Sequence, residues 1–175
     1  AIVQPPQERV LQMAKAEPKA APQTVTAKAA ILETEKGPIT IELYADDAPI
    51  TVANFSRLVK EGFYNQANMK FHRVVPGFVV QTGDPTGTGA GGSKERIPLE
   101  VDNKLSHDGA GVVAMARGPD PNSASSQFYI TLAPQKTLDG KYAIFGRVIS
   151  GGDLLPQIEA NTKLYGVKLV DPDNV

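Results

Sequence analysis

Apolar and polar residues alternate in many short runs between residues 30 and 170, and this pattern dominates the chain. Ile39, Ile41 and Leu43 alternate with polar residues, which is the period of two expected of a half-buried strand. The turn-forming cluster at 35–38 joins them to residues 30–32, so a hairpin is predicted. Further strand-like runs lie at about 70–82, 96–101, 111–116, 127–132, 142–149 and 163–170.

Two segments have a helical spacing instead. The first carries an apolar stripe formed by Val52, Phe55, Leu58 and Val59. Asp46 or Asp47 is expected to cap this helix, Pro49 suits its first turn, and Gly62 suits its end. A second helix is predicted over 153–160. Many short strands with only two helices indicate a mostly β fold, a closed antiparallel β-barrel capped by two α-helices.

The first 27 residues differ from the rest, since they are rich in Ala, Pro, Gln and Lys. Four prolines in this segment exclude one continuous helix. A chain of 175 residues favours one domain plus a tail. We therefore assign 1–27 to an N-terminal extension or linker and 28–175 to the folded domain. The extension is either a flexible tail or a segment that docks on the domain or on a partner.

Composition narrows the possible functions. The 18 Lys and Arg residues nearly balance the 19 Asp and Glu residues, which argues against binding of nucleic acid or anionic membranes through net charge. The chain has no cysteine, which excludes disulfides and thiolate chemistry, and its two histidines lack the spacing of a metal site. No apolar run approaches the ~20 residues needed to span a bilayer. No signal peptide is visible in residues 1–20, and the cellular compartment stays open.

The stretch 71–84 places Arg73 in the middle of a strongly apolar, strand-like run. An arginine in such a run is rare unless it is paired or takes part in chemistry. By itself, Arg73 fits a structural residue that bonds backbone carbonyl groups as well as it fits a functional one. The stretch, however, closely resembles the signature of the cyclophilin-type peptidyl-prolyl cis-trans isomerases. Two further blocks, 126–130 and 138–141, match the same family in the same order, and three ordered blocks are far more specific than one.

The resemblance covers about residues 28–170. It implies an eight-stranded closed barrel and a monomeric isomerase that assists protein folding by acting on X-Pro bonds of peptides and proteins. The barrier to this rotation is ~20 kcal/mol and comes from amide resonance, so no covalent bond has to break. An enzyme need only favour the twisted amide, in which the prolyl nitrogen accepts a hydrogen bond. A guanidinium beside an apolar pocket suits this step, which requires no nucleophile, metal or cofactor.

By the same resemblance, Arg73, Phe78 and Gln81 are the expected catalytic residues. Strand alternation alone would place Phe78 on the face opposite Arg73, but Pro76 and Gly77 interrupt the strand and permit a change of register. The resemblance assigns substrate binding to Val79, Ala116, Arg117, Gln127, Tyr129, Leu138 and Tyr142.

Several residues depart from the pattern of many eukaryotic members. Arg117 stands where Asn is frequent, and an Ala-Arg pair is similar to the bacterial-like branch of the family. Tyr129 replaces Phe, Thr137 replaces Trp, and Tyr142 replaces His. Because the missing Trp offers an indole donor and a broad apolar face, we expect weak binding of the cyclic peptide cyclosporin. These changes also leave an alternative open, a non-catalytic cyclophilin-fold module that binds Pro-containing segments of a partner.

The two histidines and the glycine-rich segment 87–92 are interpreted as structural features. The isomerisation needs no acid or base, so His72 is expected to be structural and His107 to be a hydrogen-bonding loop residue. The segment 87–92 has the spacing G-x-G-x-x-G of dinucleotide sites, but Pro98 opposes the long helix that such sites require. A flexible surface loop beside a peptide-binding groove is predicted there.

Overall fold

The computed structural model describes residues 29–101 and 104–170. The predicted N-terminal extension therefore lies outside the described residues. The strands are β1 (Ala29–Thr34), β2 (Gly37–Leu43), β3 (Arg73–Val75), β4 (Val79–Thr82), β5 (Val112–Met115), β6 (Phe128–Thr131), β7 (Ile144–Ser150) and β8 (Leu164–Val170). Within the described residues, the helices are α1 (Pro49–Lys60) and three 3₁₀ segments, η2 (Phe63–Asn65), η3 (Lys136–Leu138) and η4 (Gly152–Gln157).

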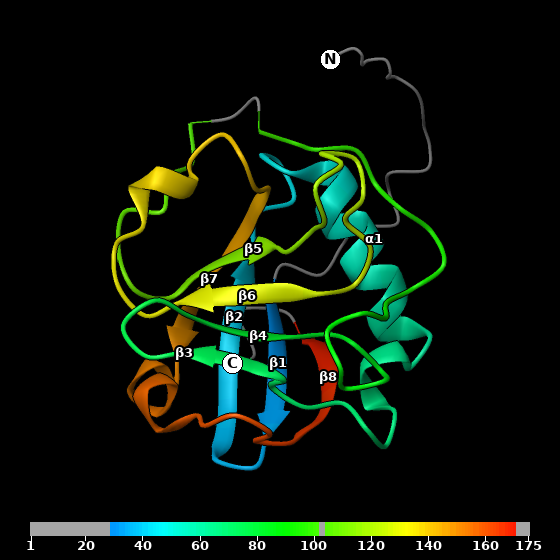
Figure 1. Ribbon diagram of the computed structural model, residues 1–175, viewed down its shortest axis with the longest axis vertical. Coiled ribbons are helices and arrows are strands. Elements are labelled where there is room, and N and C mark those ends of the chain that lie inside the picture. Colours follow the sequence, from blue (N-terminus) through cyan, green and yellow to red (C-terminus); the bar gives the residue numbers. More distant parts are fainter. Residues whose placement is uncertain (1–28, 102–103, 171–175) are drawn as a thin grey trace.

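All eight strands belong to one antiparallel sheet with the order β3-β4-β6-β5-β7-β2-β1-β8. The sheet is strongly curled, since β4 and β6 run across the view of Figure 1 whereas β1 and β2 run along it. Within the described residues, the two ends of the sheet are joined just before β3 and β8 by an isolated bridge between Lys70 and Lys163 and by backbone hydrogen bonds of Phe71 with Asn161 and Thr162, and no ladder pairs β3 with β8. The mostly β, eight-stranded antiparallel fold is confirmed, but the predicted closure of the barrel is not.

The sheet buries apolar side chains on both faces. Along β6, Phe128 and Ile130 belong to the main core, whereas Tyr129 between them belongs to a second, smaller cluster. Val79 and Val80 on β4 divide between the two clusters in the same way. This follows from the period of two, because successive side chains point to opposite faces of a strand. The main core lies under α1, and the second cluster forms the floor of the site described below.

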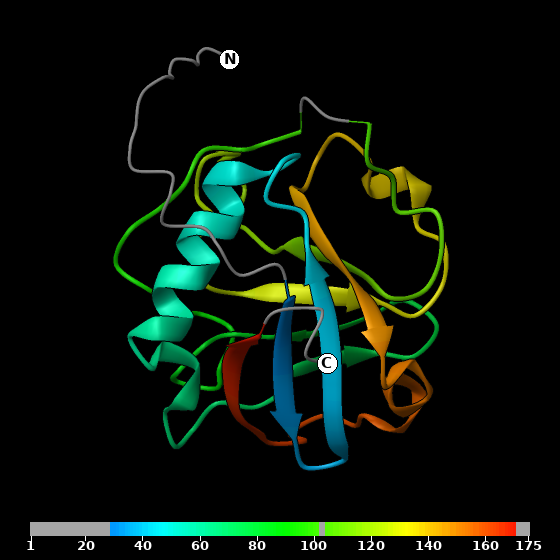
Figure 2. The same cartoon turned by 180° about the vertical axis from the view of Figure 1, so that it is seen from behind.

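Helix α1 lies along one side of the curled sheet, beside β8, as the view from behind shows (Figure 2). Pro49 is its first residue and Gly62, with φ of 78°, follows its end, as predicted. The predicted Asp46 or Asp47 cap is wrong, because Ala48 occupies the N-cap without a side-chain hydrogen bond. The carboxylate of Glu100, fifty residues further along the chain, instead accepts the backbone N–H groups of Ile50 and Thr51 at 3.0 and 2.8 Å.

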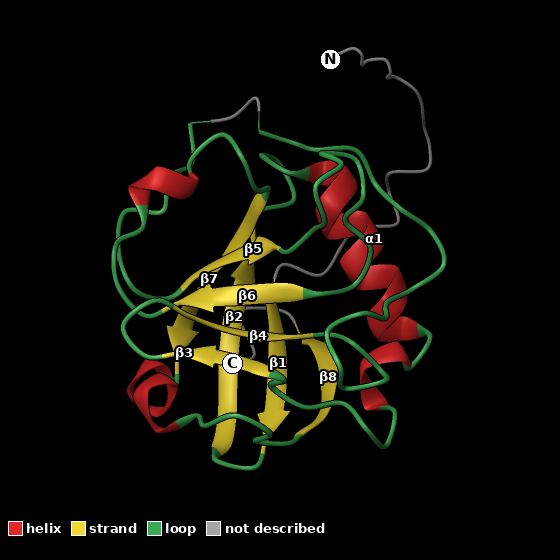
Figure 3. Ribbon diagram, viewed as in Figure 1, coloured by secondary structure: helices red, strands yellow, loops and turns green. Residues whose placement is uncertain are grey.

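Three other expectations from the sequence are corrected. The second helix, predicted over 153–160, is the 3₁₀ segment η4, which contains Pro156; proline has no N–H for the α-helical ladder. The apolar run 70–82 divides into β3 and β4 at a tight turn. The predicted strand 96–101 reduces to one bridge between Ile97 and Ala124, as its neighbours lie in loops (Figure 3).

The Glu100 cap predicts a specific stability defect. Replacing Glu100 with Ala should lower the free energy of unfolding by about 1–2 kcal/mol, since two N–H groups at the start of α1 lose their acceptor. The control is Glu95→Ala, which removes an exposed ion pair with Arg57 and should change stability by less than about 0.5 kcal/mol. Urea denaturation of the three proteins measures the difference, and equal midpoints would contradict the assignment of the cap.

Candidate active site

A tight turn brings Arg73 and Gln81 opposite each other. Pro76 and Gly77 join β3 to β4, and the N–H of Phe78 donates to the carbonyl of Val75 at 2.9 Å. Gly77 has φ of 74°, so the turn has the Pro-Gly arrangement of type II. The turn sets the register in which Arg73 pairs with Gln81. Directly paired residues share a face of a sheet, and the guanidinium donates from Nη1 to Oε1 of Gln81 at 3.3 Å.

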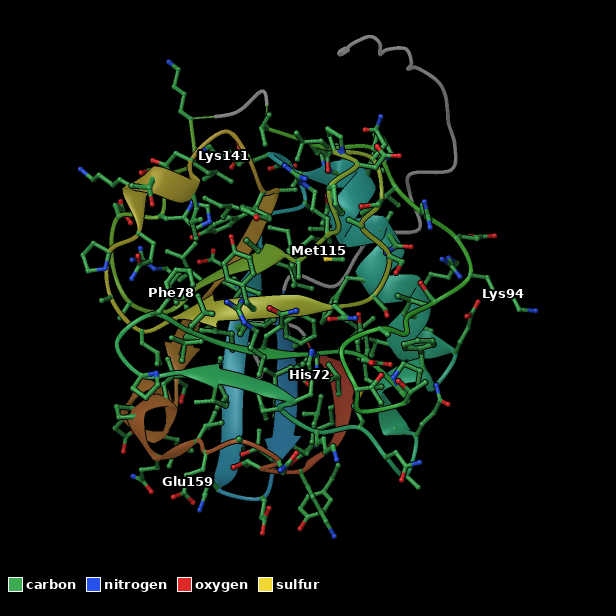
Figure 4. All side chains as sticks on the ribbon, in the orientation of Figure 1. His72, Phe78, Lys94, Met115, Lys141 and Glu159 are labelled. Carbon is green, nitrogen blue, oxygen red and sulfur yellow. The ribbon has the colours of Figure 1, made fainter. Side chains whose placement is uncertain are left out.

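The same row continues across the sheet. Gln81 pairs with Tyr129 on β6, and Tyr129 pairs with Ala114 on β5. Phe78 lies beside this row, on the loop between β3 and β4 (Figure 4), with the guanidinium carbon of Arg73 at 5.8 Å from its ring centre. The turn at Pro76 and Gly77 therefore places Phe78 on the same side as Arg73, which plain strand alternation would not do.

These side chains surround a cavity of about 250 Å³, the proline-pocket candidate, which we call the main pocket. Its lining contains nine of the ten residues singled out from the sequence: Arg73, Phe78, Val79, Gln81, Ala116, Arg117, Tyr129, Leu138 and Tyr142. The side chains come from β3, the β3–β4 turn, β4, β6, η3 and the segments that follow β5 and η3. Phe78, Leu138 and the rings of Tyr129 and Tyr142 contribute apolar surface to this pocket, and Arg73, Gln81 and Arg117 contribute polar groups.

Gln127, the tenth residue, lines a second cavity of about 470 Å³, which we call the side pocket. Gln81, Ala116 and Arg117 line both cavities, so the two are adjacent. The side pocket is otherwise formed by the glycine-rich loop, by Arg96 and by the 118–125 segment. The side pocket thus extends from the main pocket toward the glycine-rich loop, residues 87–92, which was predicted from the sequence to lie beside a peptide groove.

A chain of amide groups connects Arg73 to that loop. Gln81 accepts from Arg73 through its oxygen and donates through Nε2 to Oε1 of Gln127 at 2.9 Å. Gln127 in turn donates from Nε2 to the carbonyl groups of Gly89 and Gly91 at 2.9 and 2.7 Å. Every amide in this chain has its donor and acceptor roles assigned by its neighbours, so the oxygen of Gln81 is directed toward the arginine.

The glycine-rich loop is organised around the carboxylate of Asp84, which is fully buried. It accepts the N–H groups of Thr86, Gly89 and Gly91 at 2.8, 2.6 and 3.1 Å, and also the hydroxyl of Thr86. Burial raises the pKa of this carboxyl, but the hydrogen bonds from Thr86 and from the loop N–H groups lower it more, so that its pKa lies well below the usual range. The loop is held by an ionised carboxylate rather than being unconstrained.

The hydroxyl of Tyr129 forms a hydrogen bond with His107. The fully buried His107 lies with Nε2 at 2.7 Å from this hydroxyl and Nδ1 at 2.7 Å from a carboxylate oxygen of Asp139. The carboxylate can only accept, so Nδ1 carries a proton, and in the neutral form of the ring Nε2 accepts from the tyrosine. Burial raises the pKa of Tyr129, so its hydroxyl stays protonated. The added hydroxyl thus points away from the apolar pocket and toward the histidine.

His107 was assigned from the sequence only as a hydrogen-bonding loop residue, and its link to the main pocket was missed. One signal was present: a tyrosine at a position of the pocket that usually holds phenylalanine needs a partner. Asp139 adjoins Leu138 of the pocket wall, and it also accepts from the Ser106 hydroxyl at 2.5 Å. Two walls of the main pocket are therefore tied to one buried histidine.

Metal binding and membrane spanning were also checked against the described residues. Between residues 29 and 170, apart from 102–103, no group of three or more His, Asp and Glu side chains is arranged to hold a metal ion. None of the helices in that part of the chain has the length and apolar character to cross a membrane. His72, labelled in Figure 4, is half-buried beside Gly89, and burial lowers its pKa.

Comparison with known proteins identifies the family. The model of the cyclophilin type peptidyl-prolyl cis-trans isomerases matches residues 29–174. "Peptidyl-prolyl cis-trans isomerase-like 1" of Aspergillus niger is 53% identical over 122 residues, covering 68% of this chain and 74% of that protein. "Peptidyl-prolyl cis-trans isomerase CYP18-2" of Arabidopsis thaliana is 45% identical over 146 residues, with coverages of 82% and 84%.

Solved structures agree with the sequence relatives. A cyclophilin type peptidyl-prolyl cis-trans isomerase of Cryptosporidium parvum superposes with a TM-score of 0.75 at 29% identity, over 83% of this chain and 98% of that one. A second structure of that protein, in the presence of the dipeptide Ala-Pro, gives 0.74 at 30% identity, over 82% and 99%. The chain belongs to the cyclophilin type peptidyl-prolyl cis-trans isomerase family. The named relatives are fungal, plant and protozoan proteins, so they give no support to the bacterial-like assignment.

The His107–Tyr129 bond predicts non-additive mutations. Tyr129→Phe leaves Nε2 of the histidine without its donor, and His107→Leu leaves the tyrosine hydroxyl buried without an acceptor. The double variant should be less destabilised than the sum of the single variants by about 1–2 kcal/mol, measured by urea unfolding. Tyr142→Phe combined with His107→Leu serves as the control and should be additive. Additivity in both pairs would show that the bond contributes nothing.

Proposed function

We propose that the protein catalyses cis-trans isomerisation of X-Pro bonds in the main pocket, with Arg73 as the group that stabilises the twisted amide. The observation that carries the proposal is the placement of this guanidinium: it lines the main pocket, lies beside the ring of Phe78, and is hydrogen-bonded to Gln81. A guanidinium stays charged and offers planar donors, and so it needs no proton transfer to act.

The proposed mechanism follows from differential binding. The apolar side chains of Phe78, Leu138 and Tyr129 hold the proline ring, while the rest of the peptide lies along the groove past Gln127 and Ala116. As the amide twists, its nitrogen loses conjugation and becomes a hydrogen-bond acceptor for Arg73. Because neither planar isomer offers this acceptor, the arginine stabilises the transition state more than it stabilises either ground state. The amide chain through Gln81 holds the donor in place before the substrate arrives.

We further propose that residues 28–175 form the catalytic domain and that 1–27 form an extension, because β1 begins at Ala29 and the family match covers 29–174. A monomer is sufficient for the mechanism, since all the proposed groups come from one chain. A bacterial-like branch assignment would rest on the pair Ala116 and Arg117.

Isomer exchange in a short Ala-Pro-containing peptide, followed by NMR, tests the role of Arg73. Arg73→Ala should lower kcat/KM by about a hundredfold or more, the usual cost of removing one donor to the transition state. Arg147→Ala, an equivalent change at an exposed arginine on β7, should leave the rate unchanged. Circular dichroism should be the same for all three proteins, since Arg73 is exposed on a short strand.

Two outcomes would contradict the proposal. Full activity in Arg73→Ala would remove the arginine from the mechanism. Slow exchange in the wild type, with the peptide still bound, would point to the non-catalytic module that holds Pro-containing segments.

Weak binding of cyclosporin is a separate expectation. Thr137 lies in η3, next to Leu138 of the main pocket, where it offers neither an indole donor nor a broad apolar face. Calorimetric titration should give a dissociation constant in the micromolar range or weaker, and Thr137→Trp should tighten binding by about tenfold. Nanomolar binding by the wild type would refute this expectation.

A further inference from the structure

Arg117 occupies the boundary between the main pocket and the side pocket, and its guanidinium is fixed there. Nε donates to the carbonyl of Lys141 at 2.8 Å, and Nη1 donates to the carbonyl of Gly118 at 2.9 Å. The group also lies over the ring of Tyr142, with its central carbon 4.9 Å from the ring centre. An arginine gives up much rotamer freedom when it is held at one place, so a ligand that uses it here loses less entropy on binding.

The groove around Arg117 carries an excess of positive charge. Arg73, Arg96 and Arg117 line the two cavities, whereas Asp120 is the one carboxylate among the described lining residues. The carboxylate of Asp120 accepts the N–H of Asn122 in its own turn at 2.9 Å. Over residues 29–101 and 104–170, none of the three arginines forms an ion pair with a carboxylate. The structure therefore offers charged donors toward the groove whose charge is not neutralised locally.

We infer that the side pocket selects X-Pro substrates that carry an acidic side chain close to the proline, with Arg117 as the main specificity-determining residue and Arg96 as a weaker contributor at the exposed rim. This inference rests on the proposed function of the main pocket. It deepens that function by naming the class of substrate that the site prefers.

The geometry limits where the acidic residue can be. Arg117 lines both cavities, so a carboxylate that reaches it belongs to a residue one or two positions from the proline, because an extended chain advances about 3.3 Å per residue. A carboxylate accepts two parallel N–H bonds from a guanidinium and is the ligand best matched to this group. A lysine side chain at the same position would face three arginines and should be disfavoured.

A structural role for Arg117 is the competing explanation, since its stacking on Tyr142 also supports a wall of the main pocket. A purely structural arginine would affect all peptides alike. The ratio of rates for charged and neutral peptides separates the two roles, because a general loss of activity cancels in the ratio.

The experiment compares kcat/KM for peptides that differ only in having Glu, Gln or Lys one or two positions before the proline or one position after it. The wild type should prefer Glu over Gln by about three- to tenfold at one of these positions, and Gln over Lys. The preference should fall toward unity between low salt and 1 M NaCl, where the screening length shrinks to about 3 Å.

Arg117→Gln should reduce the Glu-to-Gln ratio to about one, and Arg96→Gln should reduce it partly. Arg147→Gln, the matched change on β7 outside both cavities, should keep the wild-type ratio. Equal rates for Glu and Gln peptides in an active wild type, or an unchanged ratio in Arg117→Gln, would overturn the inference. Absence of turnover on every peptide would instead refute the proposed function, so the two failures are distinguishable.

Discussion

The antiparallel register of β3 and β4 is the constraint on which the site depends. The turn at Pro76 and Gly77 sets it, and it places Arg73 opposite Gln81 and hence in one row with Tyr129. A slip of one residue would turn every side chain of β3 to the other face of the sheet. The arginine would then point toward the main core, and the pocket would lose its charged rim. The remaining site residues can surround one pocket with Arg73 only because the strands keep this register.

The two faces of the curled sheet have different roles: one packs the main core and the other supports the main pocket. The inner face and α1 form the main core, which includes the largest buried rings, Phe55, Tyr64, Phe71, Phe128 and Phe145. The outer face carries the smaller cluster beneath the main pocket. Because alternate residues of the same strands serve both, the site has a rigid floor without a domain of its own. Hydrogen bonds also hold the polar groups of the site, through the amides of Gln81 and Gln127 and through the buried His107.

Much of this fold could be predicted from local pattern. The alternation at 39–43 and the apolar stripe of α1 predicted their elements because each depends on neighbours in sequence. Two of the failures have long-range causes. Glu100 caps α1 from fifty residues away, which no local signal in 46–49 reveals. The strand predicted at 96–101 has the right residues, but only Ile97 finds a bridge partner.

The candidate site was predicted by family resemblance rather than by geometry. The chemistry of isomerisation explained why an arginine suits the reaction. Spacing along the sequence could not show that Arg73, Gln81 and Gln127 lie close together in space. The structure brings nine of the ten candidates to one cavity and Gln127 to its neighbour, although their roles stay proposals. His107 was missed because its partners, Tyr129 and Asp139, are 22 and 32 residues away along the chain.

The way in which the glycine-rich loop is attached has a consequence for how the protein can diverge. Gln127 holds the loop through the carbonyl groups of Gly89 and Gly91, and Asp84 holds it through N–H groups. None of these bonds uses the side chain of the exposed Ala90, in the loop, or of the exposed Lys94, just after it. Substitutions there can alter the outer surface of the groove while the backbone scaffold behind Arg73 is preserved. The loop is thus a region where new client preferences can evolve at little cost to the underlying chemistry.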